Sequence, residues 1–302
     1  MPAFAVTVLF ALLLCRSVAP KKPVGINLDP TNADGSPSAD AIAATGASWI
    51  RIEFKANAGS SFDSAVRFYR EALRRHTTKV LMIIDYSSVP GAPWGGTPEQ
   101  WLSYSETFAS VAARLAQNFT GLVSAYEIWN EPDLNATHVP ATSYGVLLQH
   151  AYTSIKANVR HPTDVVFGGL ASGNPQFVAN AMAGNGGVLA CDQVGLHPYG
   201  QRPFPDWPSP TWGFGTVAAL VANYVAVVGN NVPIFITEVG TNDLQVQGSF
   251  PWMIFDSTSQ LEAVSVTLWF CWSDGMVSPF GLLTAGLKEK AAYHSFVNYT
   301  LG

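Results

Sequence analysis

Short apolar segments rich in Val, Ile and Phe alternate with longer amphipathic segments along most of this chain, and this alternation limits the possible folds more than any other feature. The pattern is typical of repeated strand and helix units that build a parallel β-sheet. Eight segments are predicted to be strands: 24–27, 49–53, 80–85, 125–130, 165–169, 193–197, 234–238 and 265–270.

Between the predicted strands, apolar residues recur every three or four positions, which is the period of an amphipathic helix. Helices are predicted around 62–73, 101–115, 144–155, 217–228 and 288–299. Eight strands with eight crossovers in about 280 residues predict a single-domain α/β fold, the (β/α)8 TIM barrel, whose usual size is about 250 residues. An open doubly wound sheet is the alternative, but it normally has a glycine-rich phosphate-binding turn after its first strand. The segment Gly25-Ile26-Asn27-Leu28 is not such a turn.

Composition excludes two classes of protein. With 48% hydrophobic and 12% charged residues, the chain can bury a large core and is not a disordered protein. Its formal charge is −5, and the basic residues form no cluster beyond Lys21-Lys22 and Arg74-Arg75, so we expect no nucleic-acid partner. Trp and Tyr recur in segments that also contain Pro and Gly, which are typical of loops. Aromatic rings on loops suit flat, partly apolar ligands, although each ring could instead belong to the core.

Residues 1–19 are predicted to be a signal peptide. The run 4–14 is almost entirely apolar, and the small residues Ser17 and Ala19 behind it resemble a signal-peptidase site. Because the run is too short to span a bilayer, we expect a secreted protein without a membrane anchor and one mature domain over 20–302. Asn-X-Thr sequons, which are consistent with a glycosylated surface, begin at Asn118, Asn135 and Asn298.

Two predicted strands end in a glutamate. The fourth closes with Trp129-Asn130-Glu131-Pro132, and the seventh with Ile236-Thr237-Glu238-Val239. Since the fourth and seventh strands of an eight-stranded barrel face each other, we expect Glu131 and Glu238 to point into one crevice from opposite sides of a bound molecule. Cleavage of a glycosidic bond needs such a pair, one carboxyl group protonated and the other ionised. The positions of Glu131 and Glu238 at two strand ends predict a glycoside hydrolase. If the configuration is retained, the two carboxyl groups should lie about 5–5.5 Å apart.

Other chemistries lack their motifs. A metal-dependent barrel hydrolase needs several His and Asp ligands at strand ends, and the six histidines form neither His-X-His nor His-Glu-X-X-His. We therefore expect no metal and no other cofactor. The Gly-X-Ser-X-Gly motif of serine hydrolases does not occur. A non-catalytic carbohydrate-binding barrel stays open as an alternative, because a fold does not determine function.

These motifs resemble those of the clan A glycoside hydrolases, the retaining (β/α)8 enzymes that include families 5 and 39, and the resemblance extends over nearly the whole mature chain. It implies that Glu131 is the acid/base, that Asn130 contacts a sugar 2-hydroxyl, and that Glu238 is the nucleophile. A protonated acid opposite an ionised nucleophile is what the double-displacement mechanism requires.

The same resemblance implies further substrate-binding residues. Arg51 would hold the charge of the nucleophile, His197 and Tyr199 would contact the site, and Trp269 and Trp272 compete for the role of a tryptophan platform under the sugar. From the residues alone, two alternatives remain open. Arg51 could pair with Glu53 or Glu127 inside the barrel, and His197 could be a core histidine.

Together the sequence predicts a secreted, monomeric, retaining hydrolase of β-linked glycans. Endo action on a polysaccharide is favoured by the loop aromatics, and an exo-acting β-glycosidase is the alternative.

Cys191 precedes the sixth strand, at the bottom of the barrel, whereas Cys271 follows the eighth, at the top. Their Cα atoms should therefore lie beyond the roughly 7 Å that a disulfide permits.

Overall fold

The computed structural model describes residues 21–56, 61–207 and 215–302. The predicted signal peptide, 1–19, lies outside the described residues. So do Trp212 and Phe214, two aromatic residues of a segment that also contains Pro and Gly. No helix in the described ranges is both long enough and apolar enough to cross a membrane.

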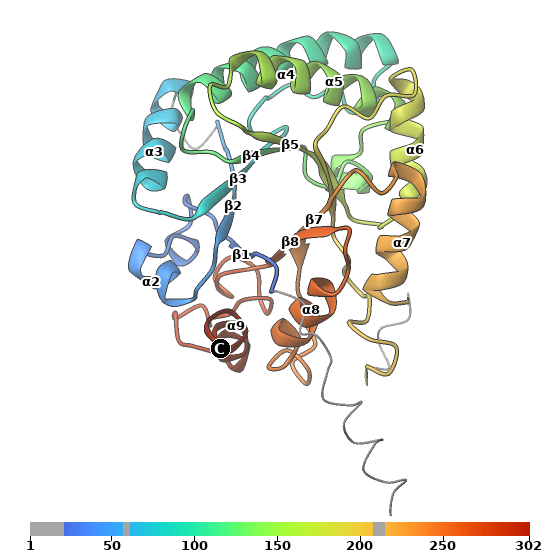
Figure 1. Cartoon of the computed structure of the whole chain (residues 1–302). Coiled ribbons are helices and arrows are strands. Elements are labelled where there is room, and N and C mark those ends of the chain that lie inside the picture. Colours follow the sequence, from blue (N-terminus) through green and yellow to red (C-terminus); the bar gives the residue numbers. More distant parts are fainter. Residues whose placement is uncertain (1–20, 57–60, 208–214) are drawn as a thin grey trace, which may run out of the picture.

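Eight parallel strands close into a barrel in sequence order, which confirms the predicted single-domain (β/α)8 fold (Figure 1). Each strand pairs with its sequence neighbours, and β8 closes the barrel by pairing with β1. The strands are β1 (Val24–Asn27), β2 (Trp49–Glu53), β3 (Lys79–Ile84), β4 (Ala125–Ile128), β5 (Asp164–Leu170), β6 (Gln193–Leu196), β7 (Ile234–Val239) and β8 (Val264–Trp269).

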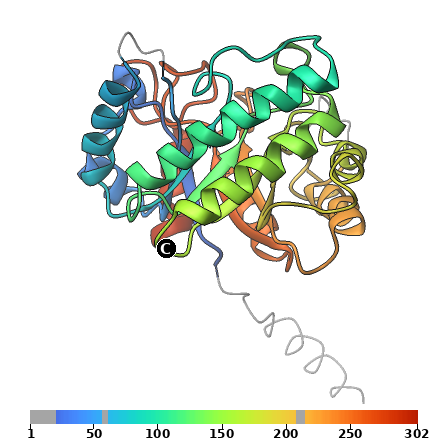
Figure 2. The same cartoon turned by 90° about the horizontal axis from the view of Figure 1, so that it is seen from above.

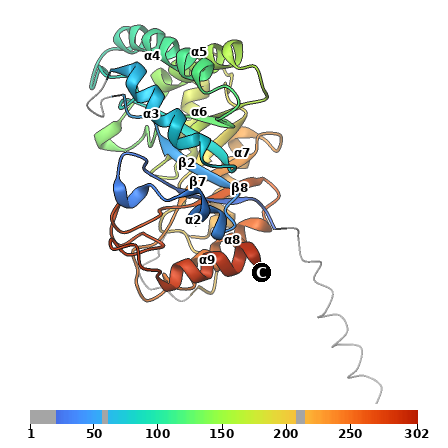
Figure 3. The same ribbon diagram turned by 90° about the vertical axis from the view of Figure 1, so that its left-hand side faces the viewer.

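Helices surround the barrel and cover its outer face (Figures 1 and 2). They are α2 (Ala39–Ala44), α3 (Phe62–Arg74), α4 (Pro98–Asn118), α5 (Ala141–Asn158), α6 (Pro175–Gly184), α7 (Val217–Val228), α8 (Phe250–Ser259) and α9 (Ala291–Leu301), with short 3-10 turns at Ala33–Gly35 and Asn135–Thr137. The two longest, α4 and α5, pack side by side (Figure 2), and α8 packs against α9 (Figure 3).

Strand alternation divides the barrel interior into layers. Side chains two residues apart on a strand share a face, so Trp49, Arg51 and Glu53 all belong to one face of β2. A lower apolar layer is formed by Trp49, Leu81, Ala125, Val166, Phe235, Val266 and Leu268. Arg51 and Glu127 stand one step above it, toward the carboxyl ends of the strands. A packed apolar plug therefore supports the polar residues at the mouth of the barrel.

Most strand bounds agree with the prediction within one residue, but β4 ends at Ile128, two residues earlier than expected. Trp129 and Glu131 adopt positive φ angles of 72° and 50°, a conformation that L side chains rarely adopt and that cannot continue an extended strand. Asn130 and Glu131 therefore lie on a sharp turn above the strand. The last helix also begins later than predicted, at Ala291.

Both cysteines of the described chain are free thiols, as the predicted strand positions require. Cys191 lies just before β6 and Cys271 lies just after β8.

Candidate active site

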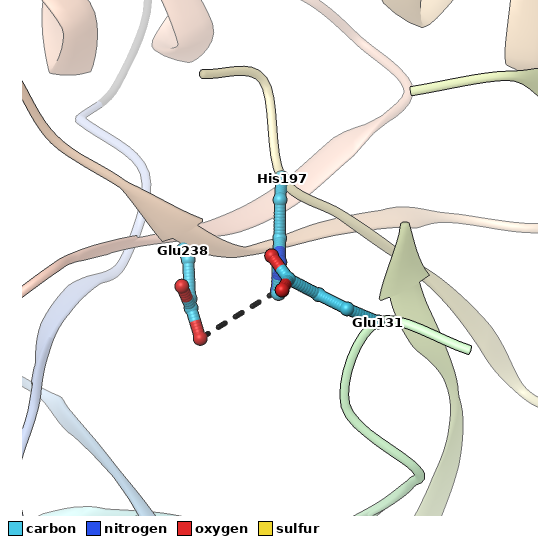
Figure 4. Close-up of side chains that lie close together, drawn as sticks. All are labelled: Glu131, His197 and Glu238. Atoms are coloured by element: carbon cyan, nitrogen blue, oxygen red, sulfur yellow. Dashed lines mark hydrogen bonds and ion pairs between the residues drawn. The ribbon is translucent and has the colours of Figure 1, made fainter. Parts of the chain in front are cut away.

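Carboxylate and imidazole groups converge at the carboxyl ends of the strands, the face on which TIM-barrel enzymes build their sites. One oxygen of Glu131, one oxygen of Glu238 and a ring nitrogen of His197 all lie within 4.8 Å of one another (Figure 4). Retaining glycosidases hold their carboxyl groups about 5–5.5 Å apart, and inverting enzymes about 6.5–9.5 Å. The oxygens of Glu131 and Glu238 are therefore close enough for the retaining arrangement.

Glu238, on β7, lies in surroundings that favour its ionised form. Its side chain is 9% exposed, and one oxygen accepts a hydrogen bond from the guanidinium of Arg51. The hydroxyl of Tyr199 donates to the other oxygen at 2.9 Å. A neighbouring cation and a hydrogen bond to the charged form both stabilise a carboxylate. Both contacts are ones that suit a carboxylate acting as a nucleophile.

Arg51, on β2, binds two carboxylates at once. Besides Glu238, it contacts Glu127, whose Oε2 accepts from the Arg51 Nε at 2.6 Å. Burial lowers the pKa of Arg51, but the charges of Glu127 and Glu238 outweigh burial and raise it above its usual value. Both pairings that the sequence allowed for Arg51, with Glu238 and with Glu127, therefore occur together. Glu53 forms its ion pair with Lys55 instead, at 3.6 Å.

Asn130 is held by the same guanidinium. An Nη of Arg51 donates to Asn130 Oδ1 at 2.7 Å, and the other Nη donates to Asn27 Oδ1 at 2.8 Å. Because the Asn130 oxygen is turned toward Arg51, the amide N–H groups remain as donors for a ligand. This arrangement fits the contact with a sugar hydroxyl that the resemblance implies for Asn130.

Glu131 has a different environment from Glu238. Its side chain is 17% exposed, and its Oε1 lies 2.9 Å from Nδ1 of His197. Its nearest ionisable partner is thus an imidazole, whereas that of Glu238 is a permanent cation. Two carboxyl groups in unlike environments are the pattern expected when one acts as acid and the other as nucleophile.

His197 is fully buried but is not an isolated core histidine. Its Nδ1 contacts Glu131, and its Nε2 lies 3.0 Å from Thr237 Oγ1. Burial lowers the pKa of the ring, but the charges of Glu238 and Glu131 outweigh burial and raise it. Gly169 on β5 gives the ring its space, because a Cβ at that position would lie 2.3 Å from His197 Nε2.

The structure corrects the prediction of a tryptophan platform under the sugar. Trp269 is fully buried at the end of β8, where its Nε1 donates to the Phe280 carbonyl at 3.2 Å. Trp272 lines a separate cavity beside α2, together with Leu283. Among the described residues, Phe270, and neither Trp269 nor Trp272, lines the cavities at Glu238. Successive residues at a strand end point to opposite faces, so Phe270 faces the site when Trp269 faces the helices.

Two cavities meet at Glu238, and both are also lined by Asn130 and Phe270. The first has a volume of about 230 Å³ and extends over β1 to β3, where Asp29, Arg51, Glu53, Lys55, Asp85 and Tyr86 contribute to its wall. The second, of about 550 Å³, extends over β6 to β8 and is lined by Glu131, Tyr199, Gly200, Gly240, Thr241, Asn242 and Phe280. The site is therefore an open cleft with space on both sides of Glu238.

Two residues that the sequence reading did not assign to the site belong to its framework. Glu127 was considered as a partner of Arg51 inside the barrel, and Thr237 was not singled out. The Thr237 hydroxyl donates to Glu127 Oε1 at 2.9 Å, and the Gly169 N–H donates to the same oxygen at 3.0 Å. The available signal was the strand period, because Glu127 lies two residues after the inward-facing Ala125.

Glu131, His197 and Glu238 are also close enough to share a metal ion. Their polar atoms, however, already have partners. Both nitrogens of His197 are in hydrogen-bond contact, and Glu238 is paired with the Arg51 guanidinium, whose positive charge would repel a metal cation. The donor set therefore fits a hydrogen-bonded carboxylate site better than a metal centre, and the absence of a metal stays a prediction.

No family model matches the sequence, and no curated protein matches it. The structure is similar to many solved structures. A family 39 glycoside hydrolase from Bacteroides cellulosilyticus WH2 superposes with a TM-score of 0.69 at 17% identity, covering 92% of this chain and 64% of that one. This chain thus spans about two thirds of the length of that structure.

Two further structures cover nearly equal shares of both chains. A GH5-4 broad-specificity endoglucanase from Clostridium longisporum has a TM-score of 0.65 at 12% identity and covers 91% of this chain and 95% of its own. Xylanase 10B from Thermotoga maritima has a TM-score of 0.61 at 15% identity, with 93% and 95% covered. At such low identity these similarities establish the fold, and they match the fold that the sequence resemblance implied.

Proposed function

We propose that this protein is a retaining glycoside hydrolase that cleaves β-linked glycans. The observation that carries the proposal is the pair Glu131 and Glu238, whose oxygens lie within 4.8 Å in unlike electrostatic surroundings. Structural neighbours named as a xylanase, an endo-β-1,3-glucanase and a β-glucosidase support the same class of substrate.

In the first step, Glu238 attacks the anomeric carbon. Glu131 gives its proton to the glycosidic oxygen as the bond between that oxygen and the anomeric carbon breaks, and a covalent glycosyl-enzyme remains on Glu238. The carboxylate charge of Glu238 is consumed in this step. Arg51 and Tyr199 hold Glu238 in place, through the guanidinium contact and the 2.9 Å hydrogen bond, so that it attacks without reorientation.

In the second step, Glu131 acts as a base. It takes a proton from water, the water oxygen bonds to the anomeric carbon, and Glu238 leaves as a carboxylate. The sugar has then been displaced twice from opposite faces, so its β configuration is retained. The 17% exposure of Glu131 is compatible with access of this water.

Endo action is the finer part of the proposal. The two cavities extend from Glu238 in opposite directions, over β1 to β3 and over β6 to β8, so sugar units can occupy both sides of the cleaved bond. Tyr86, 37% exposed, lines the first of these cavities and contacts Trp94, which is 49% exposed. An exo-acting enzyme would need one side blocked. Its product from a polysaccharide would be a monosaccharide or disaccharide, whereas endo action releases a series of oligosaccharides from β-glucan, mannan or xylan.

Secretion as a monomer remains part of the proposal. The apolar run 4–14 and the small residues Ser17 and Ala19 support a cleaved signal peptide. Expression with residues 1–19 in a secreting host, followed by N-terminal sequencing and mass measurement of the medium protein, tests cleavage and oligomeric state together. An uncleaved, cell-associated product would refute this part.

Azide rescue tests the two catalytic roles. In Glu131→Ala, Glu238 can still form the glycosyl-enzyme from a β-glycoside whose leaving group needs no proton, but the second step lacks its base. Azide needs no base and should give the β-glycosyl azide. In Glu238→Ala, azide enters from the opposite face and should give the α-azide.

The exposed Glu106→Ala, on α4, is the control and should keep full activity. Exchanged azide stereochemistry would mean that the roles are reversed. Full activity in both active-site variants would refute the assignment.

A further inference from the structure

A hydrogen-bonded chain leads away from Glu131 behind the cleft. Glu131 contacts Nδ1 of His197, Nε2 of His197 contacts Thr237 Oγ1, and Thr237 Oγ1 contacts Glu127 Oε1, at 2.9, 3.0 and 2.9 Å. His197, Thr237 and Glu127 are all buried, so water does not compete for these contacts. Glu131 and Glu238 are drawn with His197 in Figure 4.

The direction of each hydrogen bond in this series follows from Glu127, the residue at its far end. Glu127 is ion-paired through Oε2 with Arg51, and its Oε1 already accepts the Gly169 N–H at 3.0 Å, so Glu127 acts as a carboxylate that only accepts. Thr237 has one hydroxyl proton, and that proton points to Glu127. The Thr237 oxygen must then accept from His197, which places a proton on Nε2.

A neutral imidazole carries one N–H, so Nδ1 of His197 presents a lone pair to Glu131. An oxygen and a lone pair at 2.9 Å form a favourable contact only when a proton lies between them, and Glu131 supplies it. We infer that Thr237 is a positioning residue that fixes the tautomer of His197 and thereby makes the protonated form of Glu131 the one that the site stabilises. The inference rests on the proposed function, in which that proton reaches the glycosidic oxygen.

The charged groups around the His197 ring show what the alternative protonation state would be, an imidazolium beside an ionised Glu131. Glu131 faces Nδ1, Glu238 lies 3.9 Å from Nε2, and Arg51 and Glu127 lie beyond them. If the proton of Glu131 moved to Nδ1, His197 would become an imidazolium and Glu131 a carboxylate. Glu131 could then not act as the acid. The charges of Glu238 and Glu131 together outweigh burial and raise the pKa of the ring. When Glu131 holds the proton, its charge no longer favours the imidazolium, and burial together with the Arg51 cation favours the neutral ring, so the neutral pair is the form proposed here.

Nitrogen NMR of the intact protein reads the tautomer without any substrate. In ¹⁵N-histidine-labelled protein, with His197 assigned by comparison with His197→Gln, we expect a protonated Nε2 and an unprotonated Nδ1 near neutral pH. Thr237→Val keeps the branched shape but removes the hydroxyl, and should shift the ring toward the Nδ1–H tautomer. Thr237→Ser restores the hydroxyl and should restore the signal.

Thr267→Val is the matched control, because Thr267 is a buried strand threonine whose hydroxyl lies 3.0 Å from that of Thr258. It should leave the His197 signals unchanged. A neutral Nδ1–H ring, or a doubly protonated ring, in the unmodified protein would overturn the inference.

Kinetics give the functional test. An Nδ1–H donor in Thr237→Val would stabilise ionised Glu131, so the basic limb of the kcat/KM profile should move to lower pH by about one unit. At neutral pH, hydrolysis of an unactivated glycan should fall about tenfold, whereas a dinitrophenyl glycoside, which needs no proton, should react at nearly the unmodified rate in its first step.

An unchanged basic limb in Thr237→Val would overturn the inference. If the unmodified protein hydrolysed no glycoside at all, the proposed function would fail, and the NMR result would still decide the tautomer. A loss of rate on both substrates with unaltered pH dependence would indicate a merely structural role for Thr237.

Discussion

At the scale of single residues, the charge of Arg51 stabilises the folded protein and also holds the carboxylates of the candidate site. Arg51 neutralises two buried carboxylates, Glu127 and Glu238. Arg51→Met should leave both without a cation and lower the free energy of unfolding by about 3–5 kcal/mol, as measured in urea. The exposed pair Arg75–Glu71, at 3.4 Å, is the control, and Arg75→Met should cost about 0.5 kcal/mol or less. Equal effects of the two substitutions would contradict this account of Arg51.

The Tyr199 hydroxyl stabilises the carboxylate of Glu238. It donates to Glu238 Oε2 at 2.9 Å and so favours the ionised carboxylate. Tyr199→Phe removes this hydrogen bond to the carboxylate, so the acid limb of the kcat/KM profile should move to higher pH by about one unit. Tyr152→Phe, a change on the outer helix α5, should leave the profile unchanged. An acid limb that stays in place in Tyr199→Phe would argue against Glu238 as the group that must be ionised.

At the scale of elements, β5 contributes to the site by lacking a side chain. A Cβ on Gly169 would lie 2.3 Å from His197 Nε2 and 2.8 Å from Thr237 Oγ1. Gly169→Ala should therefore displace the imidazole, reduce activity at least about tenfold and lower stability by about 1–3 kcal/mol. Gly286→Ala is a matched control, because its Cβ would meet only Thr284 Oγ1, at 3.9 Å. A fully active Gly169→Ala enzyme would exclude a role for the position of His197.

The strands could be predicted because their signal is local. Runs such as 24–27 and 49–53 agree with β1 and β2, since buried parallel strands are continuous apolar segments bounded by turns. The end of β4 could not be predicted, because nothing in the local pattern indicates positive φ angles at Trp129 and Glu131. Such conformations are stabilised by the surrounding structure.

The site could be predicted in its charges but not in its supporting contacts. The two glutamates follow from strand order, whereas Thr237 acquires its role only because β7 brings it between Glu127 and His197. The resemblance to the clan A enzymes assigned the aromatic platform to Trp269 and Trp272. The structure instead places Phe270, at the end of β8, in the wall of the two cavities.

At the scale of the whole molecule, Asp85 links stability to pH. Burial and the neighbouring Glu53 raise the pKa of Asp85 to about 8. The folded protein therefore holds a proton that the unfolded chain releases near its usual value of about 3.9, so this contribution to stability is lost as pH rises from about 4 to about 8. Asp85→Asn should flatten the fall of Tm across that window. The exposed Asp63→Asn is the control, and an unchanged slope in Asp85→Asn would contradict the prediction.

The thiols give an independent check of the fold. Burial raises the pKa of Cys191 and raises that of Cys271 to about 12, so few thiolates exist at neutral pH. In protein lacking residues 1–19, a thiol reagent should react slowly with the folded state and quickly with both cysteines in denaturant. A missing thiol signal in denaturant would mean that the two cysteines are bridged and that their strands are misplaced.

The central claim is that Glu131 and Glu238 carry out a double displacement, and its stereochemical outcome can be measured directly. Proton NMR of the first products released from a β-linked oligosaccharide distinguishes the anomers before mutarotation mixes them. With Glu238 as nucleophile and Glu131 as acid/base, the β anomer should appear first and the α anomer only later, at the rate of spontaneous mutarotation. Initial release of the α anomer would mean a single displacement by water and would contradict the role assigned to Glu238.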